Sequence, residues 1–303
     1  MRVGVLVPVH GFVPFLADAL DGILAQEADM EIVVVDDGSP QPLVLHPAHA
    51  ARVTLVRRPF AGGPAAARAT GVEQLGEGVA LIALCDADDA WSPGALATMV
   101  RALEGEPGVG WAFATALIVG IDGRPTGERW TPPAAGRLDA GTFAPDLYAA
   151  NAVPTSSVVL RRGALRDAGG FASPVRVAED WELWLRLCRA GVDTLCVHEA
   201  TVRYRRHPGG LTADVTALAT AQLVIHQQYA PFVGAEVARR VLAEDYAALA
   251  AGRTRDGDHR GACEAWAQVA ARRPLRRNER ARRLALTVPG VRARLGRGDP
   301  YRR

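Results

Sequence analysis

Apolar residues along the first hundred positions fall into short runs separated by helical stretches. Val3–Val9 is a nearly continuous apolar run that includes Pro8, which is typical of a buried parallel strand. Between residues 12 and 24 the apolar residues recur every three or four positions, and this predicts an amphipathic helix. Three further strands are expected from short apolar runs, at residues 31–35, 53–56 and 79–84.

Two turn motifs predict where further helices begin. Gly62-Gly63-Pro64 opens a helix that we expect to reach about Leu75, because proline is favoured at the first helical position. Ser92-Pro93 predicts another start, with the serine as cap and the proline as the first helical residue. This alternation of strands and helices predicts an α/β fold, with a mainly parallel central sheet flanked by helices.

The pattern changes after residue 110. Residues 111–121 indicate a strand that ends at Asp122-Gly123, a strong hairpin signal. From about Ala213 onward the pattern is helical only. Between these two regions we expect a loop-rich stretch, a short strand and a helix closed by glycine, at residues 136–151, 156–160 and 179–191 respectively.

Composition narrows the classes of protein to consider. The 303 residues are 49% hydrophobic and 22% charged, as in ordinary globular proteins, and the net charge of +2 is too small to imply nucleic acid. No apolar run approaches membrane-spanning length, and no signal peptide precedes the first strand, so we expect a cytoplasmic protein. Without a Cys-x-x-Cys pair, we expect reduced, buried thiols and no zinc at Cys85, Cys188, Cys196 and Cys263.

Acidic residues follow two of the predicted strands. Asp36-Asp37-Gly38 ends one, and Asp86-Ala87-Asp88-Asp89 ends another. Each motif alone is an ordinary turn former. The carboxyl ends of parallel strands share one edge of a sheet, where ligands bind, so we expect both motifs to face one cleft. Crowded carboxylates repel one another, and a divalent cation with oxygen ligands offsets that cost.

These motifs, taken together and in order, resemble the family 2 glycosyltransferases of the GT-A fold. The resemblance covers about residues 1–210 and leaves the tail outside. Its matching stretches are 5–10 (VLVPVH), 33–39 (VVVDDGS), 62–71 (GGPAAARATG), 84–89 (LCDADD), 156–162 (SSVVLRR), 168–171 (AGGF), 179–186 (EDWELWLR) and 204–207 (YRRH).

The resemblance implies an inverting, metal-dependent transfer of a sugar from a nucleotide diphosphate sugar, with UDP-sugars favoured, to an acceptor hydroxyl. The Gln-x-x-Arg-Trp motif of processive members is absent, which favours transfer of a single sugar. We expect the product to be a cell-surface polysaccharide or glycoconjugate. The implied catalytic domain covers residues 1–212, with a nucleotide-binding half (1–105) and an acceptor half (106–212), and residues 213–303 form a helical extension.

Residue roles carry over from the family motifs. Asp86 would face the ribose, Asp37 the base, and Arg68 the nucleotide; the alternative for Arg68 is a surface pair with Glu73. Arg205 stands in a Gly-rich region suited to closing over a diphosphate. The implied nucleotide-sugar site consists of Pro8, Val9, Asp37, Arg68, Asp86, Ala87 and Arg205.

The resemblance also implies a cation site and a general base. Asp88 would bind Mn²⁺ or Mg²⁺, with His207 completing the shell or touching phosphate; a plain surface loop is the alternative for His207. Asp89 is either an auxiliary ligand or the cap of the loop that leads to Ser92. Asp180, in the Glu179-Asp180 pair, matches the base, whereas ordinary capping of a helix start is the structural alternative.

Two other functional classes stay open, and so does the role of the tail. A sugar-phosphate nucleotidyltransferase also uses Asp-x-Asp, and an inactive nucleotide-sugar-binding protein would keep the fold. Residues 272–303 contain twelve arginines against Glu279 and Asp299. We expect this tail to pack against a second copy or to touch an anionic surface such as the inner face of the membrane; a solvated helical face is the alternative.

Overall fold

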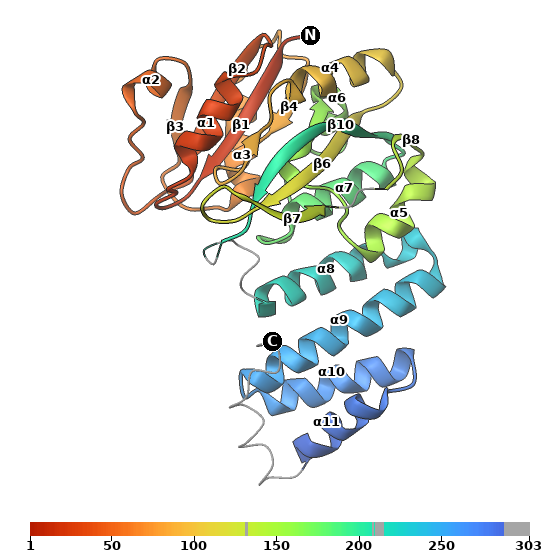
Figure 1. Ribbon diagram of the computed structural model, residues 1–303. Helices are drawn as coiled ribbons and strands as arrows, with labels where there is room; N and C mark the ends of the chain where they lie inside the picture. The colour runs from red at the N-terminus through yellow and green to blue at the C-terminus, as the bar shows by residue number, and fades with distance from the viewer. Residues whose placement is uncertain (131–132, 208, 210–214, 288–303) are drawn as a thin grey trace. The chain divides into compact units, whose positions relative to one another are not determined.

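The computed structural model describes residues 1–130, 133–207, 209 and 215–287. Its contacts divide the chain into two units, Met1–Gly210 and Leu211–Arg303. The described part of the first unit contains one ten-stranded sheet (Figure 1). Its strands are β1 (Val3–Val9), β2 (Met30–Asp36), β3 (Thr54–Arg57), β4 (Leu81–Leu84), β5 (Ala90–Trp91), β6 (Trp111–Val119), β7 (Pro125–Trp130), β8 (Gly136–Leu138), β9 (Val159–Arg161) and β10 (Thr194–Arg205).

Strand direction determines which loops meet. The order across the sheet is β3-β2-β1-β4-β9-β6-β10-β5, with β7 beside β6 and β8 beside β10. β3, β2, β1 and β4 are parallel, and β10 is parallel to β6, whereas β9 runs antiparallel to both β4 and β6. β6 and β10 therefore point the same way as β1–β4, and their carboxyl ends share one edge with the start of β9. The predicted mainly parallel sheet is confirmed.

Helices cover both faces of the sheet, as expected. α1 (Leu16–Leu24) and α4 (Ala95–Gly105) pack with the odd-numbered valines of β1 in one apolar core. On the other face lie α3 (Pro64–Glu73), α5 (Ala140–Ala149) and α7 (Glu179–Arg189). Trp184 of α7 stacks on Trp111 of β6 with ring centroids 5.2 Å apart, and both side chains are fully buried in the core.

A glycine allows α3 to approach the sheet closely. A Cβ atom added to Gly71 would lie 2.8 Å from Cδ2 of Leu6 and 3.3 Å from Cγ2 of Val35, so a larger residue would push the helix away from β1 and β2. This close packing places Arg68, one turn earlier in α3, beside the edge where the strands end.

Two helix starts differ from the predictions. The first helix begins at Leu16 rather than near residue 12, and Phe12 is 92% exposed. Pro14 disfavours helical geometry at the residue before it, which explains the later start. α4 begins at Ala95 rather than at Ser92-Pro93, because Gly94 is its N-cap in the left-handed conformation (φ 74°).

The prediction that residues 136–151 are rich in loops is wrong. This segment contains β8, α5 and their connection, and the side chain of Asp139 caps α5 by accepting a hydrogen bond of 3.0 Å from the Thr142 amide. Pro145 lies inside the helix. The expected strand at 156–160 is narrower, since a 3₁₀ turn, η1 (Thr155–Ser157), precedes β9. The Asp122-Gly123 hairpin between β6 and β7 is confirmed.

The second unit is helical, as predicted. Its described elements are α8 (Val215–Val233), α9 (Ala235–Arg255), α10 (His259–Arg272) and α11 (Arg277–Thr287). Trp266 of α10 is buried in its core, and buried His226 bonds Asp245 at 2.6 Å. None of the helices within the described ranges is long and apolar enough to cross a membrane. Residues 288–303, the last part of the Arg-rich tail, lie outside the described residues.

Two short helices complete the described elements, and the cysteines are largely as expected. The helices are α2 (Pro47–Ala50) and α6 (Arg162–Asp167). All four cysteines are free thiols, and three of them are buried; the expected burial is wrong for Cys263, which is half-buried.

Candidate active site

The acidic loop after β4, residues 86–89, lies against the end of β10. His207 Nε2 is 2.9 Å from Asp88 Oδ2, although the two residues are 119 positions apart in the sequence. Burial raises the pKa of Asp88, and so does the neighbouring charge of Asp86, whereas His207 opposes the rise. A carboxylate oxygen and an imidazole nitrogen are thus adjacent and only partly exposed.

This donor pair fits Mn²⁺ or Mg²⁺ in a site where other ligands come from elsewhere. No cluster of three or more His, Cys, Asp or Glu side chains suited to a metal occurs within the described ranges. Mg²⁺ is usually held by one or two carboxylates plus substrate phosphates and water, and Mn²⁺ accepts both carboxylate and imidazole ligands. Asp88 supplies a carboxylate of the kind that such an ion takes, and His207 places a nitrogen 2.9 Å from it.

Asp89 does not have the capping role, which was one of the two alternatives predicted for it. Its carboxylate is 2% exposed, accepts a hydrogen bond of 2.6 Å from the Ser156 hydroxyl, and accepts another of 2.8 Å from the Arg205 amide. Burial and the charges of the neighbouring acids raise its pKa well above the ordinary value. Asp89 therefore joins the acidic loop to η1 and β10, and it does not cap the segment leading to Ser92.

Arg68 is a buried link between both halves of the first unit. Its guanidinium is 2% exposed and donates to Asp86 Oδ1 (2.6 Å) and to Glu179 Oε1 (2.8 Å). Burial opposes its charge, but the adjacent carboxylates raise its pKa further above the usual value. The alternative of a surface pair with Glu73 is wrong. Its Nε has no hydrogen-bond partner within the described part of the chain.

Asp180 lies in the first turn of α7, next to the end of this link. Its Oδ2 accepts a hydrogen bond from the Thr155 hydroxyl, and its Oδ1 accepts one of 2.7 Å from the Trp181 amide. Burial raises the pKa of Asp180, while Thr155 and Arg68 oppose the rise. Burial also raises the pKa of Glu179, to about 7, again against Arg68.

The backbone before this acidic pair is strained. Ala178, the N-cap of α7, has φ 60° and ψ 27°, and it is the one non-glycine residue in the left-handed region within the described ranges. Such a conformation costs about 1–2 kcal/mol for an L-residue. Strain of this kind clusters at functional sites, where the surroundings enforce it.

The end of β2 is held tightly. Both oxygens of Asp37 accept hydrogen bonds from the Gly62 and Gly63 amides (2.7–3.0 Å), and Oδ1 also pairs with Arg58. The Val9 carbonyl accepts a hydrogen bond of 2.7 Å from the Asp37 amide, directly after half-buried Pro8. The carboxylate of Asp36 accepts hydrogen bonds from the Ser39 and Leu43 amides and from Arg57.

Arg205 is used internally rather than presented to solvent. Its Nε donates to the Asp88 carbonyl (2.9 Å), and one Nη donates to Asp18 of α1 (3.0 Å). Its other Nη reaches the hairpin carbonyls of Gly120 and Ile121. The side chain thus joins the backbone of the acidic loop to α1 and to the β6–β7 hairpin. Pro208 and Gly210, expected to give the following segment its flexibility, lie outside the described residues.

Three residues of the site were not predicted from the sequence. Thr155 and Ser156 bond Asp180 and Asp89, and Arg58 pairs with Asp37. The run of three hydroxyl residues at 155–157 was the available signal for the first two. Nothing in the local sequence distinguishes Arg58 from Arg57.

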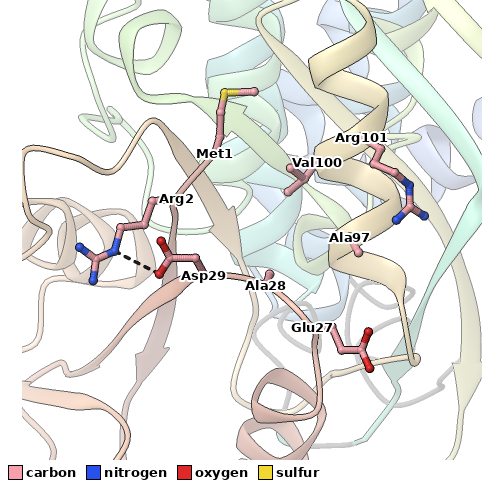
Figure 2. Close-up of a pocket in the computed structure, with 8 residues that line it drawn as sticks. All are labelled: Met1, Arg2, Glu27, Ala28, Asp29, Ala97, Val100 and Arg101. Carbon is pink, nitrogen blue, oxygen red and sulfur yellow. Dashed lines mark ion pairs between the residues drawn. The ribbon is translucent and has the colours of Figure 1, made fainter.

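A hollow of about 500 Å³ lies at the other edge of the sheet (Figure 2). Met1 and Arg2, which line it, precede β1, whereas the acidic residues follow the strands. Its charged groups are partly engaged, since Arg2 lies 3.5 Å from Asp29. This hollow is therefore remote from the chemistry described above. The remaining lining residues are Glu27, Ala28, Ala97, Val100 and Arg101.

The fold and the family matches define a glycosyltransferase of the GT-A type, which uses a nucleotide sugar. The family model described as glycosyl transferase family 2 matches residues 4–145, and the model described as glycosyl transferase family group 2 matches residues 81–240. The chain belongs to glycosyltransferase family 2. The resemblance noted in the sequence is confirmed, and the nucleotidyltransferase and inactive-protein alternatives are set aside.

Solved structures with the same fold bind nucleotide sugars. The chain is similar to S. aureus TarS 1–349 in complex with UDP-GlcNAc, with 15% identity, a TM-score of 0.63, and coverage of 100% of this chain and 93% of that chain. It is also similar to the mannosyltransferase PcManGT from Pyrobaculum calidifontis in complex with GDP-Man and Mn²⁺, with 19% identity, a TM-score of 0.58, and coverage of 97% and 86%. At these identities the likeness concerns the fold.

A curated relative matches part of the chain. The succinoglycan biosynthesis protein ExoW of Rhizobium meliloti (strain 1021) is 34% identical over 99 residues. The match covers 30% of this chain and 31% of that protein, so the chain spans about a third of the length of this relative.

Proposed function

We propose that this enzyme transfers a single sugar, with inversion, from a UDP-sugar to a hydroxyl of a carbohydrate or lipid-linked acceptor in polysaccharide or glycoconjugate biosynthesis. The name of ExoW supports the pathway class, and the UDP-GlcNAc complex of TarS supports the donor class. The GDP-Man complex of PcManGT makes GDP-sugars the donors to compare.

The observation that carries this proposal is the link through Arg68. It joins Asp86, which we assign to the ribose, to Glu179, which adjoins Asp180. The donor side and the acceptor side of the reaction are thus held by one buried cation. Asp180 acts as the general base, because an acceptor hydroxyl must lose its proton as it attacks the anomeric carbon. A base with a pKa raised towards neutral is suited to that role.

We propose that Asp88 and His207 hold Mn²⁺ or Mg²⁺. When bound, the ion would neutralise charge that develops on the diphosphate leaving group. On the nucleotide side, we assign Asp37 and the backbone of Pro8 and Val9 to the base, although the Asp37 oxygens already bond Gly62, Gly63 and Arg58. We assign Asp86, Ala87 and Arg68 to the ribose and diphosphate; the Arg68 Nε is buried and has no hydrogen-bond partner in the described part of the chain. Arg205 contributes by supporting the Asp88 backbone.

We assign catalysis to residues 1–212 and a different role to the helices from 213 onward. Within α11, Arg277, Arg280, Arg282 and Arg283 are exposed, whereas its one acid, Glu279, is buried and paired with Arg273. A face with this charge suits an anionic lipid surface. Co-sedimentation with vesicles that contain 30% anionic lipid should exceed that with neutral vesicles and decrease with salt; equal sedimentation with both would leave a second copy or solvent as the partner.

Release of UDP tests the catalytic proposal. The purified chain is incubated with UDP-, GDP- and TDP-sugars and Mn²⁺, with water as acceptor. We expect turnover with a UDP-sugar and a loss of about 10²–10⁴-fold in Asp180→Asn, because general-base catalysis contributes that much. We expect the Mn²⁺-stimulated turnover to be lost in Asp88→Asn. Asp167→Asn, at an exposed acid of α6, is the matched control. Turnover that is unchanged in Asp180→Asn would refute the base assignment.

A further inference from the structure

Three consecutive hydroxyl residues form the turn η1, and each points to a different partner. Thr155 donates to Asp180 Oδ2, Ser156 donates to Asp89 Oδ2 at 2.6 Å, and Ser157 donates to the Pro154 carbonyl at 2.7 Å. All three side chains are buried. Two adjacent residues therefore contact the proposed base and the acidic loop, which are about ninety positions apart in the sequence.

The topology explains why this turn reaches both partners. β9 runs antiparallel between β4 and β6, so the turn that precedes it lies at the edge where β4 ends. The Leu84 amide, last in β4, donates to the Val158 carbonyl at 3.0 Å. The turn is thereby fixed to the strand from which the acidic loop emerges, and α7 begins on its other side.

Ser156 fixes the acidic loop at both ends. Its hydroxyl oxygen accepts a hydrogen bond of 2.9 Å from the Asp86 amide, while its proton is donated to Asp89. Asp89 in turn accepts a hydrogen bond from the amide of Arg205, which lies two residues before His207. The hydroxyl therefore sets the position of the loop that carries Asp88 and, through Asp89, the segment that carries His207.

Thr155 acts on Asp180 in a comparable way. Its hydroxyl donates to one carboxylate oxygen, and the Trp181 amide donates to the other, so both contacts favour the ionised form. Burial favours the neutral form. The charged or titratable groups that act on this carboxylate from the elements around it are Arg68, Asp86, Glu179 and Tyr204.

We propose that Thr155 and Ser156 are positioning residues. Their two adjacent hydroxyl groups hold the general base and the metal-binding loop in a fixed position relative to each other. This inference rests on the proposed roles of Asp180 and Asp88. It predicts that the two hydroxyls control separable properties of the enzyme, although they are neighbours in one turn.

The first test is the pH profile of kcat for Thr155→Val, which keeps the side-chain shape and removes the hydroxyl. Loss of a hydrogen bond to the ionised carboxylate raises the pKa of Asp180, so the acid limb should move up by about one pH unit. Thr155→Ser restores the donor and should restore the wild-type profile. An unshifted limb in correctly folded Thr155→Val overturns this half of the proposal.

The second test is the affinity for Mn²⁺ in the presence of UDP, measured from the electron paramagnetic resonance signal of free Mn²⁺. We expect binding about 10-fold weaker in Ser156→Ala, as is typical when a group that orients a metal ligand is removed. Asp89→Asn should cause a similar loss, and the double variant should add little to it. Wild-type affinity in Ser156→Ala would overturn this half.

Ser157→Ala is the matched control, because its hydroxyl bonds the Pro154 carbonyl and the Ala114 amide and neither acid. It should move neither the pH limb nor the Mn²⁺ affinity; a shift as large as in the test variants would show a general effect of the turn and refute the proposal. If the wild-type protein neither binds Mn²⁺ with UDP nor releases UDP, the proposed function itself fails. If the wild type does both and the variants show no separable shifts, the inference alone fails.

Discussion

The Arg68 guanidinium and the Glu179 carboxylate lie 2.8 Å apart in the protein interior, although 111 positions separate them in the sequence. Asp86 completes the arrangement at 2.6 Å from the other Nη of Arg68. One cation thus contacts two carboxylates, one from α7 and one from the acidic loop. Arg68 offsets the charge of the buried Glu179 carboxylate, and an uncompensated buried charge is strongly destabilising.

Removing Arg68 should therefore destabilise the fold as well as the site. We expect Arg68→Ala to lower the free energy of unfolding by about 3–5 kcal/mol, the usual effect of breaking a buried ion pair from one side. Arg260→Ala is the control, since Arg260 and Glu264 form an exposed pair within one helix and should contribute less than about 0.5 kcal/mol. Urea unfolding of both variants tests this, and losses of equal size would contradict it.

The pH dependence of stability should show the titration of Glu179. Burial raises its pKa to about 7 from an ordinary 4.5, against the attraction of Arg68. Between these values the folded state keeps a proton that the unfolded state has released, so the stabilising contribution is present at low pH and is lost as the pH rises through 7. Relative to Glu179→Gln, the wild type should lose roughly 3 kcal/mol between pH 4.5 and 8.

Urea unfolding of the wild type and Glu179→Gln at several pH values measures this difference directly. Glutamine keeps the shape and an acceptor for Arg68 and cannot titrate, so it is the matched variant. A difference in stability that does not change with pH would mean that Glu179 titrates alike in both states.

Local sequence patterns correctly predicted β1 and the hairpin between β6 and β7. β1 has the predicted bounds, Val3–Val9, because a buried parallel strand is a short, continuous apolar run. The hairpin at Asp122-Gly123 was equally predictable from the sequence, since its turn needs a glycine with positive φ (75° at Gly123). α5 was missed because Gly141 and Pro145 resemble loop residues, although Asp139 is an ordinary helix cap.

The partners of the site residues could not be predicted in the same way. Asp88 and Asp180 were identified from motifs, but Ser156 bonds an acid 67 positions away and Thr155 bonds one 25 positions away. A hydroxyl residue near a strand has no local feature that specifies its partner. These contacts depend on β9 being inserted antiparallel between β4 and β6, which the sequence did not reveal.

Ala178 allows a test of the strain before Asp180. Its left-handed backbone costs an L-residue about 1–2 kcal/mol, and glycine avoids that cost, although it gains about 0.4–1 kcal/mol of unfolded-state entropy. Ala178→Gly should thus raise the thermal midpoint slightly or leave it unchanged. Ala190→Gly, at the other end of α7 with φ −78°, has no strain to relieve and should lower it. Destabilisation of equal size in both variants would show that the strain at Ala178 is not significant.

Gly38 and Gly11 separate backbone strain from steric clash beside the proposed nucleotide site. Both have positive φ, 63° and 70°, but a Cβ on Gly38 would lie 2.5 Å from backbone atoms of Phe60 and Ala61, whereas a Cβ on Gly11 meets nothing within 4 Å. Gly11→Ala should cost about 1–2 kcal/mol from the backbone alone. Gly38→Ala must also displace the 60–61 backbone, which leads to the amides that bind Asp37, so it should cost more and weaken UDP binding. Urea unfolding and UDP titration of both variants measure these effects. A larger loss of stability or of UDP affinity in Gly11→Ala than in Gly38→Ala would contradict the prediction.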